Sequence, residues 1–130
     1  MRIPKDTLII VADGAGARLL RNVGGVFEPE LVQVDTLTPQ NLNDDGPAGS
    51  MPTETRGEEI DEATFAKQLA HHLNALALKN GFEAAVLIAD PQTLGQIRPS
   101  LHKEASERLL TEIPKNLTNA PIPDIVRALS

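Results

Sequence analysis

Two short apolar segments, far apart in the chain, each end at an aspartate. Residues 8–12 precede Asp13, and residues 85–89 precede Asp90. Unbroken apolar runs of this length are typical of strands covered on both faces, as parallel neighbours in an α/β sheet are. If the two strands pair in parallel, both aspartates lie at the carboxyl edge of the sheet, where open α/β sheets most often bind ligands. The two segments therefore predict an α/β fold and the location of its site.

Composition indicates one domain with an aliphatic core. The chain has 130 residues, no Trp or Tyr and only three Phe, and we expect a single domain over residues 1–130. It has no Cys, which excludes disulfides, thiolate metal sites and a cysteine nucleophile. No apolar run approaches the roughly 18–20 residues of a membrane span, and the start lacks a signal-peptide pattern. We therefore expect a cytoplasmic protein that does not associate with membranes.

The negative charge is concentrated in one segment. The net charge is −6, and residues 35–62 hold eight acidic side chains against one arginine. Residues 38–58 lack apolar periodicity and are rich in Pro and Gly, which predicts a flexible acidic loop. An ordered binding loop is the alternative, because long loops often carry function. The last third of the chain, residues 95–130, has a net charge of +1 and is the only part that is neither neutral nor acidic.

The first third of the chain predicts a three-stranded antiparallel meander. We expect strands at residues 7–12, 17–21 and 26–35. Glycine-containing turns at residues 14–16 and 22–25 connect them, since glycine accepts the backbone conformations of tight turns.

The remainder predicts helices that alternate with strands. The expected elements are a helix at 61–80, a strand at 84–89, a helix from Pro91 that Pro99 kinks or ends, a strand at 109–113 and a closing helix around 122–129. The order predicts an α/β fold with a mixed five-stranded sheet, an antiparallel three-stranded meander plus two parallel strands, with three helices. This arrangement is of the ribonuclease-H-like kind. A flavodoxin-like or Rossmann sheet would need a helix directly after the first strand.

The two aspartates have two interpretations. As carboxylates at neighbouring strand ends, Asp13 and Asp90 could hold Mg²⁺ and activate a water for phosphodiester hydrolysis, with Glu59 or Glu62 as a third ligand. Alternatively, Asp13 begins a turn and Asp90 caps a helix, the commonest roles of Asp at such places. We favour the structural roles, and we expect no bound metal and no cofactor.

Basic side chains of the last third are the candidates for phosphate contacts. They are interleaved with four carboxylates, so a mixed, solvated surface is the alternative interpretation and the one we favour. The four that we predict to bind are Arg98, Lys103, Arg108 and Lys115.

Several short motifs occur in an order that matches a known family. They are Val11-Ala12-Asp13-Gly14 before Ala17-Arg18-Leu19-Leu20, the acidic insertion, Phe65-Ala66 with Leu69-Ala70, Leu87-Ile88-Ala89 before Pro91, Leu94-Gly95 before Ile97-Arg98, and Glu112-Ile113 before Lys115-Asn116-Leu117-Thr118. Together they resemble the bacterial host attachment proteins, grouped with the bacterial relatives of archaeo-eukaryotic class 1 peptide-release factors. The chain departs from the family pattern at Asn116, usually Asp, and at Asp90, usually small or apolar. The second departure argues against a metal site, because a ligand should not be optional.

The resemblance implies a ribonuclease-H-like fold similar to the middle domain of release factors. That domain uses a Gly-Gly-Gln loop for peptidyl-tRNA hydrolysis. Here Gly24-Gly25 is followed by Val26, so release chemistry is not expected. The family name implies a part in attachment to host cells, for which an indirect cytoplasmic role fits these residues best.

These observations predict a non-catalytic binding protein whose partner is the ribosome, tRNA or another protein. Asp13, Asp90 and the four basic residues are its candidate contacts. The alternative is a Mg-dependent ribonuclease-H-like nuclease or phosphoesterase that uses Asp13 and Asp90. The sequence leaves the oligomeric state open.

Overall fold

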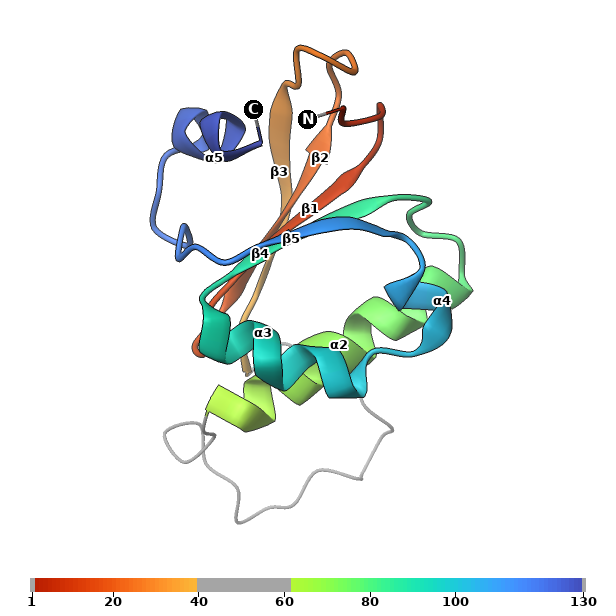
Figure 1. Ribbon diagram of the computed structural model, residues 1–130, viewed down its shortest axis with the longest axis vertical. Coiled ribbons are helices and arrows are strands. Elements are labelled where there is room, and N and C mark those ends of the chain that lie inside the picture. Colours follow the sequence, from red (N-terminus) through yellow and green to blue (C-terminus); the bar gives the residue numbers. More distant parts are fainter. Residues whose placement is uncertain (1, 40–61, 130) are drawn as a thin grey trace.

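A five-stranded sheet forms the centre of the protein. The computed structural model describes residues 2–39 and 62–129. The strand order is β3-β2-β1-β4-β5 (Figure 1). The strands are β1 (Leu8–Ala12), β2 (Ala17–Asn22), β3 (Leu31–Leu37), β4 (Ala85–Ala89) and β5 (Leu109–Ile113). The helices are α2 (Glu62–Leu78), α3 (Pro91–Ile97), α4 (Lys103–Ser106) and α5 (Ile122–Ala128), with a 3₁₀ turn, η2 (Arg98–Ser100), after α3.

The sheet is mixed, as the sequence predicts. Strands β1, β2 and β3 form an antiparallel meander. Strand β4 pairs in parallel with β1, and β5 pairs in parallel with β4. The α/β class and the mixed five-stranded sheet are therefore confirmed. The finer ribonuclease-H-like assignment stays a prediction.

The two central strands are buried along their whole length. Every residue of β1 and β4 is buried, because helices cover both faces of the sheet (Figure 1). Leu8 and Ile10 belong to the apolar cluster under α2 and α3. Ile9 and Val11 belong to the cluster on the opposite face, which includes Ile125 of α5. This burial explains why both strands are unbroken apolar runs in the sequence.

Helix α2 packs through the apolar stripe that its sequence predicts. Phe65, Leu69 and Leu73 are buried in the cluster beneath the sheet. The helix ends at Leu78, two residues before the predicted end, and Asn80 adopts the left-handed conformation, with φ 58°. The Gly81 N–H then donates to the Leu76 carbonyl at 2.7 Å and satisfies one of the last carbonyls of the helix.

Strand β3 begins later than the sequence predicts. The expected start at residue 26 is wrong, because β3 starts at Leu31. The Asn22 carboxamide oxygen accepts hydrogen bonds from the backbone N–H groups of Gly24 and Glu30, at 2.9 and 3.0 Å. These bonds hold residues 23–30 as a loop, although Val26 and Phe27 favour a strand by propensity.

The other boundaries agree closely with the prediction. Helix α3 ends at Ile97, and Pro99 lies in the 3₁₀ turn that follows, so the predicted stop at this proline is confirmed. The single turn of α4 was not predicted. Asp61, the predicted cap of α2, and residues 40–58 of the predicted acidic loop lie outside the described residues. Among residues 2–39 and 62–129, no helix is both long and apolar enough to cross a membrane.

Candidate functional site

The parallel register brings the two predicted aspartates to one edge of the sheet. Ala12 of β1 lies opposite Ala89 of β4. Asp13 and Asp90 therefore follow neighbouring strand ends, and neighbouring strands lie about 4.8 Å apart. Both residues are partly buried. The sequence predicted this juxtaposition correctly.

Asp13 organises the turn between β1 and β2. Its carboxylate Oδ1 accepts hydrogen bonds from the backbone N–H groups of Ala15 and Gly16, at 2.8 and 2.9 Å. Its own N–H donates to the Gly16 carbonyl at 2.9 Å. Asp13 thus has the turn role that sequence analysis favoured.

The second carboxylate oxygen of Asp13 contacts the C-terminal part of the chain. Thr118 donates its hydroxyl proton to Asp13 Oδ2 at 2.7 Å. Asn116 Oδ1 lies 2.9 Å from the same hydroxyl, which has a single proton to donate. The loop after β5 is therefore fastened to the carboxyl edge of β1 through Asp13.

Asp90 caps α3. Its Oδ2 accepts from the Thr93 backbone N–H at 3.1 Å, and its Oδ1 accepts from the Thr93 hydroxyl at 2.7 Å. Pro91 occupies the first turn, where a missing N–H has no consequence. The predicted capping role is confirmed. All four oxygens of Asp13 and Asp90 thus accept hydrogen bonds from the protein.

A third carboxylate for a metal ion is not found in the described residues. Within residues 2–39 and 62–129, no three His, Asp or Glu side chains are grouped so that they could hold a metal. Glu59 and the side chain of Glu62, which sequence analysis named as third ligands, fall outside the described part of the chain.

Arg18 was missed as a site residue, although it lies beside this edge. Its Nη1 donates to the carbonyls of Thr118 and Ala120, at 3.2 and 2.7 Å. Its Nε donates to Gln33 Oε1 at 2.9 Å. Arg18 therefore ties the loop before α5 to strands β2 and β3. The sequence carries no indication of this contact, because the partners are about a hundred residues apart.

Arg98 forms the strongest ion pair among the predicted basic residues. Its Nε donates to Glu112 Oε1 at 2.7 Å, and its Nη2 lies 2.5 Å from the same oxygen. The hydrogen bond and the negative charge of Glu112 raise the pKa of Arg98 above its usual value. The guanidinium is exposed but already engaged.

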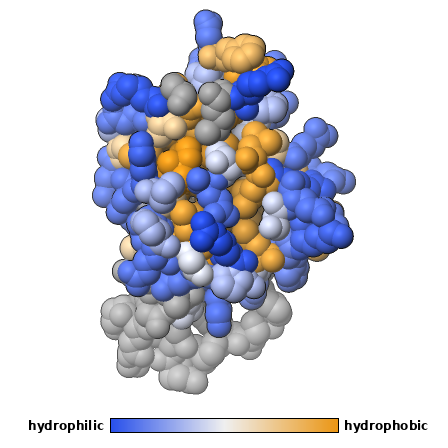
Figure 2. Space-filling view, viewed as in Figure 1, coloured by the Kyte–Doolittle hydropathy of each residue, from blue (hydrophilic) through white to orange (hydrophobic). Residues whose placement is uncertain are grey.

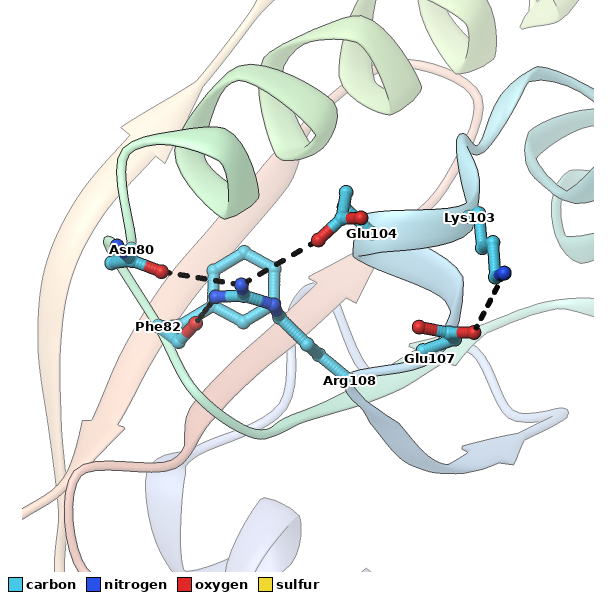
Figure 3. Close-up of polar contacts among 6 residues, drawn as sticks. All are labelled: Asn80, Phe82, Lys103, Glu104, Glu107 and Arg108. Carbon is cyan, nitrogen blue, oxygen red and sulfur yellow. Dashed lines mark hydrogen bonds and ion pairs between the residues drawn. The ribbon is translucent and has the colours of Figure 1, made fainter.

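Lys103 and Arg108 are also engaged, around α4. Lys103 lies 3.8 Å from Glu107, and Arg108 lies 3.9 Å from Glu104. Arg108 also donates to the Phe82 carbonyl at 2.6 Å and to Asn80 Oδ1 at 3.2 Å (Figure 3). Arg108 thus anchors the turn after α2 to the start of β5, a structural task.

Lys115 differs from the other three. It is exposed, and it forms no ion pair with any described residue. It follows the carboxyl end of β5, the edge that also carries Asp13 and Asp90, whereas Arg108 precedes the amino end. A strand of this length spans roughly 16 Å, so Arg108 and Lys115 lie at opposite ends of β5. The mixed-surface interpretation describes this region better than a continuous basic patch.

An open groove of about 550 Å³ lies beside β5, between this strand and helices α3 and α4. Its lining is part apolar and part polar, and it includes the Arg98–Glu112 pair. The lining residues are Leu94, Arg98, Ser106, Leu109, Thr111, Glu112 and Pro114. The sequence did not predict the groove, because residues from four separate elements, α3, η2, α4 and β5, line it.

A comparison with family models identifies the class of protein. Residues 6–129 match the model of bacterial archaeo-eukaryotic release factor family 12. The match covers nearly the whole chain, so the chain belongs to this family of release-factor relatives. A search of curated proteins found no match. The predicted relationship to release factors is confirmed, and the host-attachment name stays a prediction.

Proposed function

We propose that this chain is a non-catalytic, cytoplasmic binding protein whose partner is the ribosome or tRNA. Membership of a release-factor family supports a partner in translation. The sequence has no Gly-Gly-Gln, since Gly24-Gly25 is followed by Val26, which supports binding without peptide release. A role in attachment to host cells would then be indirect, through translation.

The proposal rests on one observation: the carboxylates of Asp13 and Asp90 are occupied by hydrogen bonds within the protein. All four oxygens of Asp13 and Asp90 accept hydrogen bonds from the turn, the α3 cap and the C-terminal loop. A carboxylate that holds these elements has fewer lone pairs for a metal or a reacting water. The edge is therefore a structural junction in this proposal.

Arg98 and Lys115 are the RNA contacts we propose. Lys115 lies on an exposed loop and forms no ion pair with the residues that the structure describes. Arg98 contacts Glu112 Oε1 with both Nε and Nη2, and it would exchange this oxygen for those of a phosphate, which guanidinium groups bind well. Lys103 and Arg108 contribute less, because each is paired with a glutamate and Arg108 also holds the Phe82 carbonyl.

Co-sedimentation with ribosomes over a salt series tests the proposal. Each neutralised phosphate releases condensed counterions, so binding should weaken steeply as salt rises. Arg98→Glu with Lys115→Glu should lower the slope of log K against log salt by about two. The matched control reverses two exposed charges, one on α2 and one in the turn that follows it, Lys67→Glu with Lys79→Glu, and should bind like the parent. No binding at low salt, or equal losses in both pairs, would contradict the proposal.

A metal-dependent nuclease or phosphoesterase is the second candidate. One observation favours it: the register that places Asp13 and Asp90 at adjacent strand ends. Mg²⁺ is commonly held by one or two carboxylates together with several waters, and a bound metal can activate a water for hydrolysis. The metal measurement at the end of the Discussion separates this candidate from the binding protein.

A further inference from the structure

Exposed apolar side chains concentrate on one hairpin. In the described part of the chain, five of the seven large hydrophobic residues that are exposed lie between residues 23 and 34. We call them the hairpin patch: Val23, Val26, Phe27, Val32 and Val34. In Figure 2 apolar atoms appear at the top of the molecule, where Figure 1 places the β2–β3 hairpin. Apolar residues gathered in this way mark interaction sites.

Phe27 is the most exposed member of the patch. Its side chain is 74% exposed, whereas the other two phenylalanines of the chain, Phe65 and Phe82, are 0% and 3% exposed. The Arg2 guanidinium lies over the Phe27 ring, 5.7 Å from its centroid. A large aromatic side chain held at the surface is typical of the anchor residues of protein interfaces.

The loop that presents Phe27 is held in place. Asn22 is fully buried and donates to the Ile3 carbonyl at 3.0 Å, while its oxygen accepts from Gly24 and Glu30. The Ile3 N–H donates to the Val26 carbonyl at 3.0 Å. A pre-formed loop loses little conformational entropy on binding, which favours its use as a docking element.

The neighbouring strand has an open edge. β3 is the outermost strand on its side of the sheet, so within the described residues no strand pairs with its outer side, although the Thr36 N–H donates to Asp35 Oδ1 at 2.8 Å. Residues 31–37 contain no Lys or Pro, two of the devices that protect natural edges. A register shift opposite Leu19 and Leu20 leaves Val34 without a partner on β2. This bulge favours pairing with a short segment over pairing along a long strand.

The charge of the β3 edge indicates which kind of partner would bind there. Glu28, Glu30 and Asp35 are exposed, and none forms an ion pair within the described residues. Residues 23–37 contain no Lys or Arg. A nucleic acid, or the same edge of a second copy, would bring like charges together, whereas a basic segment would be attracted.

We propose that β3 and the hairpin patch bind an extended, basic segment of a protein partner, which adds a sixth strand to the sheet. The added strand pairs with the outer backbone groups of β3, as in other cases of strand addition. Its alternate apolar side chains contact Val32 and Val34. Its Lys or Arg side chains lie near the three carboxylates, and Phe27 anchors the complex at the hairpin end. This surface is separate from the proposed RNA contacts.

The direct test is a titration of the ¹⁵N-labelled protein with short synthetic peptides, followed by NMR. A peptide of alternating Lys and Val should shift the amide signals of residues 26–37 and slow hydrogen exchange in β3. A peptide with Glu in place of Lys should not bind. A peptide with Pro in place of Val keeps the charge but loses the backbone N–H of every second residue and fits a strand poorly, so it reports attraction by charge and should not shift these signals.

Two variants and one control complete the test. Val34→Lys should weaken binding of the Lys-Val peptide at least about tenfold, because like charges face each other. Phe27→Ala removes only an exposed side chain, so it should weaken binding without unfolding the protein. Leu110→Lys places the same charge on β5, the opposite edge, and should bind like the parent.

Several results would overturn the proposal. One is that the Lys-Val peptide leaves the amide signals of residues 26–37 unshifted, and another is that the Pro peptide binds as tightly as the Lys-Val peptide. The third such result is an affinity for the Lys-Val peptide that is unchanged in both Val34→Lys and Phe27→Ala. Equivalent shifts with a single-stranded RNA oligonucleotide would assign the surface to nucleic acid. A dimer that forms without peptide, and that Phe27→Ala dissociates, would assign it to a second copy. None of these outcomes bears on ribosome binding through Arg98 and Lys115.

Discussion

At the scale of single residues, hydrogen-bond donors nearby decide what an edge aspartate does. Asp90 follows a buried strand, as a metal ligand would, yet the Thr93 N–H and hydroxyl occupy its two oxygens. Asp13 is occupied in the same way by two backbone N–H groups and by Thr118. Strand ends that continue into tight turns and helix caps need such acceptors, so the position of these residues alone does not indicate catalysis.

The contribution of the Asp90 cap to stability can be measured directly. Asp90→Ala should lower the free energy of unfolding by about 1 kcal/mol, because the first turn of α3 loses its acceptor. Urea unfolding followed by circular dichroism gives the difference. Asp90→Ser keeps a capping oxygen and should recover most of the loss. An Asp90→Ala protein as stable as the parent would show that the cap contributes nothing.

A second prediction concerns two adjacent glycines of the β2–β3 loop. A Cβ at Gly24 would lie 2.6 Å from the Glu28 carbonyl oxygen and 2.7 Å from the Glu30 nitrogen, both backbone atoms that cannot move aside easily. Gly24→Ala should therefore destabilise the protein by about 1–3 kcal/mol. Gly25 has no atom within 4 Å of its Cβ position, so Gly25→Ala should stay within about 0.5 kcal/mol of the parent. Equal effects in thermal unfolding would contradict the loop geometry.

At the scale of elements, Arg18 links the meander to the C-terminal part of the chain. Arg18→Ala removes the donors to the Thr118 and Ala120 carbonyls. We expect faster hydrogen exchange in residues 118–129, including α5, and unchanged protection in β4. Gln33→Ala removes the Nε partner and a hydrogen bond to Thr36 within β3 but leaves the contacts with the two carbonyls, so it serves as the control. If exchange rises equally across the sheet, Arg18 supports the whole fold and the link is not local.

Element boundaries show what the sequence could and could not predict. Strands β1 and β4 were predicted within one residue, because burial on both faces demands continuous apolar runs. The start of β3 was wrong by five residues, because five hydrogen bonds of Asn22 outweigh the strand propensity of Val26 and Phe27. Local propensity carries no information about a buried side chain that binds backbone groups eight residues away.

The candidate site was predictable only in part. The juxtaposition of Asp13 and Asp90 follows from parallel pairing of two recognisable strands. The contacts of Arg18 with Thr118 and of Arg98 with Glu112 join segments far apart in sequence. No regular spacing in the sequence indicates these contacts, so only the three-dimensional structure identifies them.

At the scale of the whole molecule, the carboxyl edge of the sheet and the outer edge of β3 are separate surfaces with different chemical character. The carboxyl edge of β1 and β4 fastens turn, helix cap and C-terminal loop together, while Lys115 lies on the loop beyond β5. The β3 edge on the other side of the sheet is apolar and acidic. A protein of this family could therefore contact RNA at one edge and a protein segment at the other, in line with the two proposals above.

The central claim is that the carboxyl edge is structural, and thermal unfolding with and without divalent metal tests it most directly. We predict that Mg²⁺ or Mn²⁺ leaves the Tm nearly unchanged, and that Asp13→Asn lowers the Tm by the same amount with metal and without it. A ligand that binds only the folded state at a hundred times its Kd would stabilise it by about 2.7 kcal/mol. A metal-dependent rise in Tm that disappears in Asp13→Asn would show a metal site at this edge, contradict the account and favour the metal-dependent hydrolase in its place.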